Sequence, residues 1–143
     1  MEEFKSQYKH LLDIPVAWGE MDALGHVNNA VYFRYFESVR LDYFESHKFM
    51  QTLTEHGKFP VLADVQCRFR RAVTFPDTLT LGARITDLNA HGFTMEYGVY
   101  SQAQQTLASV GTSKVVIVDK DTGRKGLIPE SLAKLIAQDV KQG

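Results

Sequence analysis

The sequence predicts an α+β fold in which one curved antiparallel β-sheet wraps around one long central α-helix. Two observations carry this prediction. Several segments between residues 61 and 118 alternate apolar and polar residues with a period of two, which is typical of antiparallel strands with one buried face. Residues 29–48 instead repeat their apolar positions every three or four residues, which is typical of a helix.

The composition is that of an ordinary globular protein. The chain has 143 residues, 44% of them apolar and 23% charged, and we expect residues 1–143 to form a single domain. The net charge of −1 gives no reason to expect a nucleic acid or a membrane as partner. The single cysteine, Cys67, excludes an intramolecular disulfide and a cysteine-rich zinc site. The sequence shows neither a signal-peptide stretch nor the ~20 apolar residues of a membrane span, so we expect a cytoplasmic protein.

A first strand is expected over residues 8–18, where Pro15 argues against a regular central strand and Trp18 is expected to pack at the strand end. Residues 19–28 are expected to form a loop that leads into the long helix. Asn28 and Asn29 are both suited to cap this helix, because either side chain can accept a hydrogen bond from the free N–H groups of the first turn.

The expected helix is apolar over most of its circumference. Its main apolar face consists of Tyr32, Phe36, Val39 and Tyr43. A second apolar stripe consists of Phe33, Leu41 and Phe44. A helix of this kind is usually covered on several sides, and one sheet covers only one of them. We therefore expect a second subunit to cover the rest, in a homodimer or a homotetramer.

The remaining elements follow in order. Alternating segments extend over about residues 61–69, 79–86, 93–100 and 107–118. Residues 89–92, with the sequence NAHG, are expected to form the hairpin turn between the second and third of these segments. Pro129 then begins a short helix with an apolar side formed by Leu132, Leu135, Ile136 and Val140.

A cluster of polar residues lies just before the long helix, in the sequence DALGHVNNAVY over residues 22–32. With the order of elements, the motif Asp22-x-x-Gly25-His26-x-Asn28-Asn29-x-x-Tyr32 resembles the hot-dog-fold acyl-CoA thioesterases of the 4-hydroxybenzoyl-CoA thioesterase family. The resemblance extends over nearly the whole chain, including FRRAVTFPDTL at 69–79 and VVIVDKDTGRKGLIP at 115–129. It implies hydrolysis of acyl-CoA thioesters at a site between two subunits. It also implies no metal or other cofactor, coenzyme A being part of the substrate.

By this resemblance, Asp22 is the catalytic carboxylate. A thioester is an activated acyl donor, so its hydrolysis needs a nucleophile or general base and a group that polarises the carbonyl. Asp22 could attack the carbonyl or deprotonate a water, and the sequence leaves both open; the alternative is that it only caps a loop turn. The polarising donor is expected from the free N–H groups at the helix N-terminus, either of Asn29 or of Ala30, and the resemblance favours Asn29.

The other residues of the motif are expected to bind or position the substrate. His26 either positions the thioester or assists proton transfer, unless it only holds the loop. Gly25 is expected to adopt a backbone conformation barred to other residues. Asn28 is expected to cap or fix the loop, and Tyr32 to pack in the core or line an acyl pocket. The helix residue Glu37 is a reserve candidate for the catalytic acid.

Coenzyme A carries phosphates, which arginine binds well through paired hydrogen bonds. Arg70 and Arg71 at a strand end are therefore candidate CoA-binding residues, and the resemblance adds His91 in the hairpin turn. Some family members carry several basic residues in that turn, whereas His91 stands alone here, so the nucleotide is expected to bind weakly or elsewhere. Two other functions stay open: a non-catalytic acyl-CoA-binding or regulatory module, and a hydratase or dehydratase, against which the order of Asp and His in the motif argues.

Overall fold

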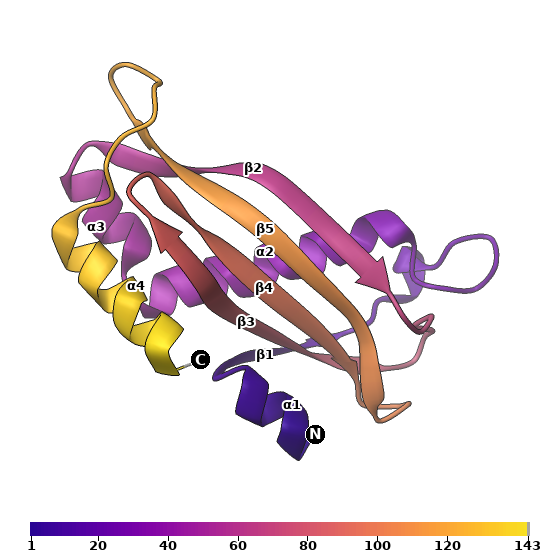
Figure 1. Cartoon of the computed structure of the whole chain (residues 1–143). Coiled ribbons are helices and arrows are strands. Elements are labelled where there is room, and N and C mark those ends of the chain that lie inside the picture. Colours follow the sequence, from indigo (N-terminus) through magenta and orange to yellow (C-terminus); the bar gives the residue numbers. More distant parts are fainter. Residues whose placement is uncertain (143) are drawn as a thin grey trace.

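The computed structural model describes residues 1–142 and shows a five-stranded antiparallel sheet curved around one long helix (Figure 1). The strands are β1 (His10–Pro15), β2 (Lys58–Phe69), β3 (Thr78–Asn89), β4 (Gly92–Ser101) and β5 (Thr106–Asp119). The helices are α1 (Glu2–Gln7), α2 (Asn29–Ser46), α3 (Phe49–Glu55) and α4 (Glu130–Gln142), and η1 (Trp18–Glu20) is a 3₁₀ turn. The predicted α+β architecture is confirmed.

The strand order in the sheet is β1-β3-β4-β5-β2, so β1 and β2 form its two edges. Asn89 pairs with Gly92 at the β3–β4 turn, which confirms the predicted hairpin. The first strand ends at Pro15, earlier than predicted, because the chain then turns into η1. The helices α1 and α3 were not predicted, since six and seven residues are too few to display a helical period.

The predicted main face of α2 is buried in the core. Tyr32, Phe36, Val39 and Tyr43 are at most 2% exposed. They share one hydrophobic cluster with the inward side chains of β3 and β4, which are Leu79, Leu81, Ala83, Ile85, Phe93, Met95, Tyr97 and Val99. The ring of Phe36 stacks on that of Tyr97 at 4.9 Å, directly over Gly111 of β5. A Cβ atom at Gly111 would lie 2.5 Å from Phe36 Cζ, so this glycine allows α2 to approach the sheet closely.

The predicted second stripe of α2 is only partly buried. Phe44 is 3% exposed and stacks on Phe49 of α3, whereas Phe33 and Leu41 are 40% and 51% exposed. The edge strand β2 also exposes large apolar side chains, namely Phe59, Val61, Leu62 and Phe69. This chain alone therefore leaves part of the apolar surface of α2 and β2 in contact with water.

The opposite face of the sheet is covered in part by the N-terminal segment. Phe4 and Tyr8 pack there with Tyr100, over the paired residues Gly82 and Gly98 of β3 and β4. The C-terminal helix α4 begins after Pro129 as predicted, and it buries Leu132 and Ile136 in the main core. Within residues 1–142, no helix combines the length and the apolar character needed to cross a membrane.

Candidate active site

The loop of residues 21–28 is a tight turn built around Asp22. The Asp22 N–H donates to the carbonyl of His26 at 2.7 Å, and Met21 and Val27 form an isolated β-bridge. Asp22 Oδ1 accepts hydrogen bonds from the N–H groups of Leu24 at 2.9 Å and His26 at 3.1 Å. Gly25 has a φ of 79°, in the left-handed region that other residues rarely adopt, as was expected of this glycine. One carboxylate oxygen of Asp22 thus stabilises the turn.

The second carboxylate oxygen of Asp22 has no hydrogen-bond partner among residues 1–142. The half-buried side chain lies beside a hollow of about 500 Å³ lined by Trp18, Gly19, Met21, Asp22, Ala23, Gly25 and Phe75. Trp18 is 75% exposed at this rim and does not pack at the strand end as predicted, because η1 turns it outward. Oδ1 of Asp22 therefore caps the turn, while Oδ2 is left free of partners from the described part of the chain, in a side chain that borders the hollow.

Within the part of the chain that the structure describes, the N-terminus of α2 leaves the N–H group of its first residue free. Asn28 is the N-cap: its Oδ1 accepts from the Ala30 N–H at 3.0 Å, and its carbonyl accepts from the Val31 N–H at 2.9 Å. The Asn29 N–H has no acceptor among residues 1–142. Of the two donors that the sequence left open, Asn29 is thus free and Ala30 is occupied.

Glu20 connects the loop to the helix, a role that the sequence analysis missed. Its Oε1 accepts from the Ala17 N–H at 2.8 Å and from the Tyr35 hydroxyl at 2.9 Å, and its carbonyl accepts from the Asn28 N–H at 2.9 Å. Tyr35 is 2% exposed, and its burial and its bond to Glu20 raise the pKa of the phenol far above its ordinary value. The one signal in the sequence is a second acidic residue two positions before Asp22.

Of the other motif residues, His26 lies at the surface and Tyr32 lies in the core. His26 is exposed, and its imidazole makes no hydrogen bond to residues 1–142; only its backbone holds the loop. Tyr32 is 2% exposed and packs edge-to-face against Tyr35 and Phe69, with ring centroids 5.8 and 5.0 Å away. Burial raises the pKa of Tyr32. Within this chain Tyr32 is a core residue with almost no surface open to a ligand.

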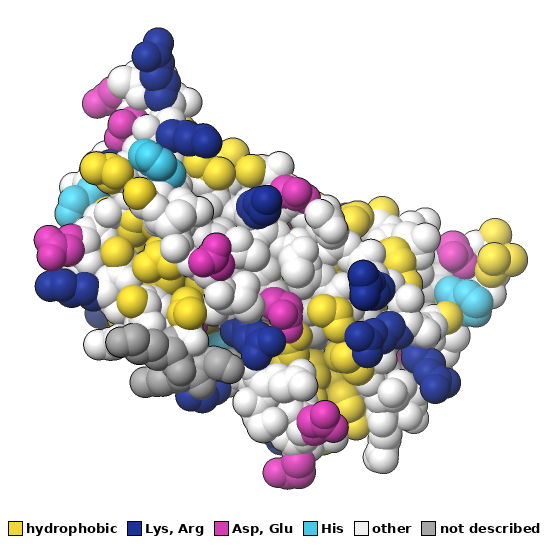
Figure 2. Space-filling model, viewed as in Figure 1, with side chains coloured by type: hydrophobic (Ala, Val, Ile, Leu, Met, Phe, Trp, Pro, Cys, Tyr) yellow, Lys and Arg dark blue, Asp and Glu magenta, His cyan; other side chains and the backbone are white. Residues whose placement is uncertain are grey.

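The candidate CoA-binding residues fall into two places. Arg70 and Arg71 directly follow β2. Two residues after Arg71, the Val73 carbonyl accepts a hydrogen bond from the Val27 N–H of the Asp22 loop at 2.8 Å, so the segment that carries the two arginines contacts this loop. Arg70 also borders a hollow of about 640 Å³ on the outer face of the sheet, where Figure 2 shows a group of basic side chains to the right of centre. His91 lies at the far end of β3, roughly 40 Å along a strand of 12 residues, and its Nδ1 bonds to the Gly126 carbonyl at 3.0 Å. One chain does not bring His91 to Asp22.

A family model described as the thioesterase-like superfamily matches residues 16–136. The chain belongs to this superfamily. The match includes the whole loop, α2 and the sheet from β2 to β5, so the elements that position Asp22 and Asn29 lie within it.

Two curated relatives align with most of this thioesterase-like chain. The long-chain acyl-CoA thioesterase FadM of Escherichia coli (strain K12) is 24% identical over 128 residues, which cover 90% of this chain and 97% of FadM. The uncharacterized protein YsmA of Bacillus subtilis (strain 168) is 28% identical over 127 residues, covering 86% and 82%.

Solved structures agree with the architecture. The PA2801 protein of Pseudomonas aeruginosa superposes with a TM-score of 0.79 at 29% identity, covering 91% of this chain and 99% of that one. A thioesterase superfamily protein from Jannaschia sp. CCS1 superposes with a TM-score of 0.80 at 26% identity, covering 92% and 82%. The predicted hot-dog fold is thereby confirmed.

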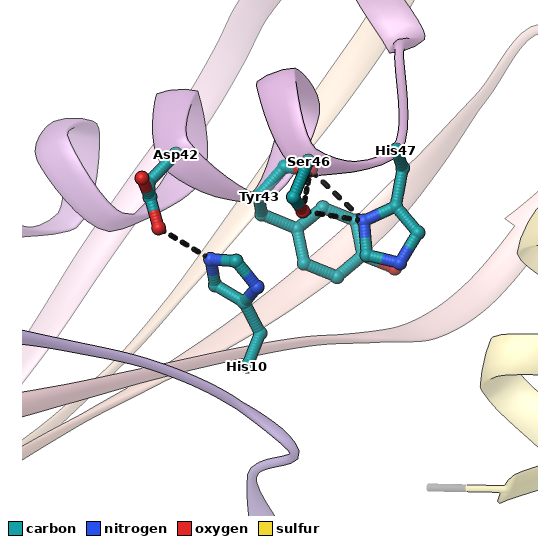
Figure 3. A network of polar contacts seen from close by, with 5 residues as sticks. All are labelled: His10, Asp42, Tyr43, Ser46 and His47. Carbon is teal, nitrogen blue, oxygen red and sulfur yellow. Dashed lines mark hydrogen bonds and ion pairs between the residues drawn. The ribbon is translucent and has the colours of Figure 1, made fainter.

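A second polar cluster of this thioesterase-like chain lies at the opposite end of α2, about 27 Å along a helix of 18 residues (Figure 3). His10 of β1 bonds through Nε2 to Asp42 at 2.8 Å, and His47 bonds through Nδ1 to the Tyr43 carbonyl at 3.0 Å. The Tyr43 hydroxyl donates to Asp139 of α4. These contacts hold β1 and α4 against α2. Across residues 1–142, no three His, Cys, Asp or Glu side chains are placed to share a metal ion.

Proposed function

We propose that this protein hydrolyses acyl-CoA thioesters to the free acid and coenzyme A, with Asp22 as nucleophile or general base and the Asn29 N–H as the donor to the thioester carbonyl. The observation that carries the proposal is the pair of groups left without partners where the loop meets α2. These are Asp22 Oδ2 and the Asn29 N–H. Membership of the superfamily supports a thioester as substrate, and the likeness to FadM supports an acyl-CoA.

The chemistry that we assign to these two groups is simple. An N–H at the positive end of a helix stabilises the negative charge that develops on the carbonyl oxygen during attack. Asp22 either attacks the carbonyl carbon itself, forming an anhydride that water then cleaves, or takes a proton from the attacking water. In both routes the C–S bond breaks, the thiolate of coenzyme A leaves, and a proton from water neutralises it. We assign no metal or other cofactor to the reaction.

We further propose that the active form is a homodimer or homotetramer with the site completed between subunits. The exposed apolar side chains of α2 and β2 support this assembly, because contiguous apolar surface is usually buried by a partner. The burial of Tyr32 supports an acyl group that lies at the surface of this chain, beneath a second subunit. Arg70 and Arg71 remain our candidates for the CoA phosphates. The narrower assignment to the 4-hydroxybenzoyl-CoA thioesterase family, and the cytoplasmic location, stay predictions.

The test is a panel of acyl-CoAs of different chain length, including aryl-CoAs and enoyl-CoAs, with thiol release followed by a chromogenic thiol reagent. We expect release with the wild type and a loss of at least about 10³-fold in kcat for Asp22→Ala, since nucleophile and base functions are both removed. Undiminished thiol release by Asp22→Ala would refute the mechanism. Binding without release would instead favour the non-catalytic module, and hydration of the enoyl-CoA would favour the hydratase.

A further inference from the structure

We infer that Glu20 is a positioning residue that sets the position of the Asp22 carboxylate relative to the N-terminus of α2. The inference rests on the proposed function for its kinetic consequence, although the contacts that support it are independent of any substrate. It explains how a loop on the protein surface keeps a carboxylate and a backbone N–H in one fixed geometry, as catalysis by two separate groups requires.

Three hydrogen bonds converge on Glu20 from three different parts of the chain. The Ala17 N–H, at the entrance of the loop, donates to Oε1 at 2.8 Å. The Asn28 N–H, at the exit of the loop, donates to the Glu20 carbonyl at 2.9 Å. The Tyr35 hydroxyl, from the second turn of α2, donates to Oε1 at 2.9 Å. One residue therefore ties both ends of the loop to the helix that follows it.

Apart from Glu20, the loop is fixed to α2 through its last residue, Asn28, which accepts hydrogen bonds from the N–H groups of Ala30 and Val31 in the first turn of the helix. The bonds from Leu24 and His26 to Asp22 Oδ1 join residues within the turn, so they move together with Asp22. The Val27 N–H bonds to the Val73 carbonyl, which fixes the loop to the segment after β2. Glu20, two residues before Asp22, adds a link from the loop to Tyr35 in the second turn of α2.

The anchor on the helix is rigid. Tyr35 is 2% exposed and packs edge-to-face against Tyr32, so its hydroxyl is held by the core. The phenol is protonated, and hence a donor, throughout the neutral range, and burial and the bond to Glu20 raise its pKa further. Because a misplacement of about 1 Å can lower a rate by about 10²-fold, releasing this anchor is expected to act on kcat.

The experiment compares four variants with the wild type in steady-state thiol release, over a range of pH. Glu20→Ala is expected to lower kcat by roughly 10²-fold with little change in KM. Glu20→Gln keeps an oxygen that accepts both bonds, so we expect at least about a fifth of the wild-type kcat and an unchanged pH profile. Tyr35→Phe loses one bond and is expected to lower kcat about tenfold. Glu45→Ala is the matched control, because Glu45 is an exposed glutamate of α2. This variant is expected to keep the wild-type kinetics.

A second readout needs no turnover. Amide hydrogen exchange at Ala17, whose N–H loses its side-chain acceptor in Glu20→Ala, is expected to be about tenfold faster in that variant than in the wild type and to be restored in Glu20→Gln. A wild type that releases no thiol would refute the proposed function while leaving this exchange test of Glu20 in place.

The inference would be overturned by a folded Glu20→Ala with wild-type kcat or unchanged exchange. It would also be overturned if Glu20→Gln were as slow as Glu20→Ala, or lost the acidic limb of the pH profile, because Glu20 would then act through its charge or its proton. If Glu20→Ala fails to fold, Tyr35→Phe decides: wild-type kcat in that variant refutes the anchor.

Discussion

Replacing Asn29 by proline removes the N–H group that we propose donates to the thioester carbonyl, and it changes little else. Asn29 is the first residue of α2, the helical position where proline is best tolerated. The preceding residue, Asn28, has φ −59° and ψ 138°, within the extended region that a following proline requires. The Asn29 N–H has no acceptor among residues 1–142, so the folded protein loses no hydrogen bond in the variant.

The expected effect is therefore on catalysis and not on stability. Removal of one donor to a developing oxyanion typically costs about 10²–10³ in kcat, or about 2.7–4 kcal/mol. The free energy of unfolding should change by less than about 1 kcal/mol, and proline can even raise it by restricting the unfolded chain. The matched control is Asn29→Ala, which keeps the N–H and should keep kcat within about twofold.

The assay is thiol release from the best acyl-CoA of the panel, combined with the midpoint of thermal unfolding for each variant. Wild-type kcat in Asn29→Pro would refute the assignment of the Asn29 N–H as the donor. Equal loss in Asn29→Ala and Asn29→Pro would also refute it, because the side chain would then be the active group.

Three further perturbations test the fold and the assembly. Gly111→Ala should destabilise the protein by about 1–3 kcal/mol in urea unfolding, because the new Cβ overlaps Phe36; an unchanged midpoint would show that α2 is not held against β5. Stability should fall as the pH rises above about 10, because tyrosines of the unfolded chain ionise there whereas buried Tyr35 and Tyr43 keep their protons; Tyr43→Phe should reduce this loss. Leu41→Glu should shift the protein toward the monomer in light scattering and lower its activity; an active variant of unchanged mass would exclude α2 from the interface.

The sequence was most informative where long periodic segments determine structure. The main face of α2 could be predicted because Tyr32, Phe36, Val39 and Tyr43 follow the helical period and burial follows from it. Phe44 illustrates the limit: it enters the core by stacking on Phe49 of α3, a helix too short to predict. Phe33 and Leu41 have a similar pattern but stay exposed in this chain. Periodicity indicates which apolar side chains should be buried, but not whether they are buried within the same chain or against another one.

The candidate site was predictable in its residues more than in its geometry. The motif identified Asp22 and both possible caps, but only the structure separates Asn28 as the cap from Asn29 as the residue with the free N–H. Glu20 escaped notice because its role depends on Tyr35, fifteen residues away, and such a contact leaves no periodic signal. His91 became a candidate because the resemblance places basic residues in its turn, and that turn follows the far end of β3, a strand of 12 residues.

The N-terminal segment and the glycine pair beneath it form a matched set. Phe4 and Tyr8 occupy the space where Gly82 and Gly98 have no side chains: a Cβ at Gly82 would lie 2.5 Å from Tyr8 Cγ, and one at Gly98 would lie 2.6 Å from Phe4 Cε2. The family match begins at residue 16, so the two glycines lie inside it and the two aromatic residues lie before it. A chimera whose N-terminal segment lacks these two aromatic side chains should therefore be less stable, unless position 82 or 98 gains a side chain that fills the space.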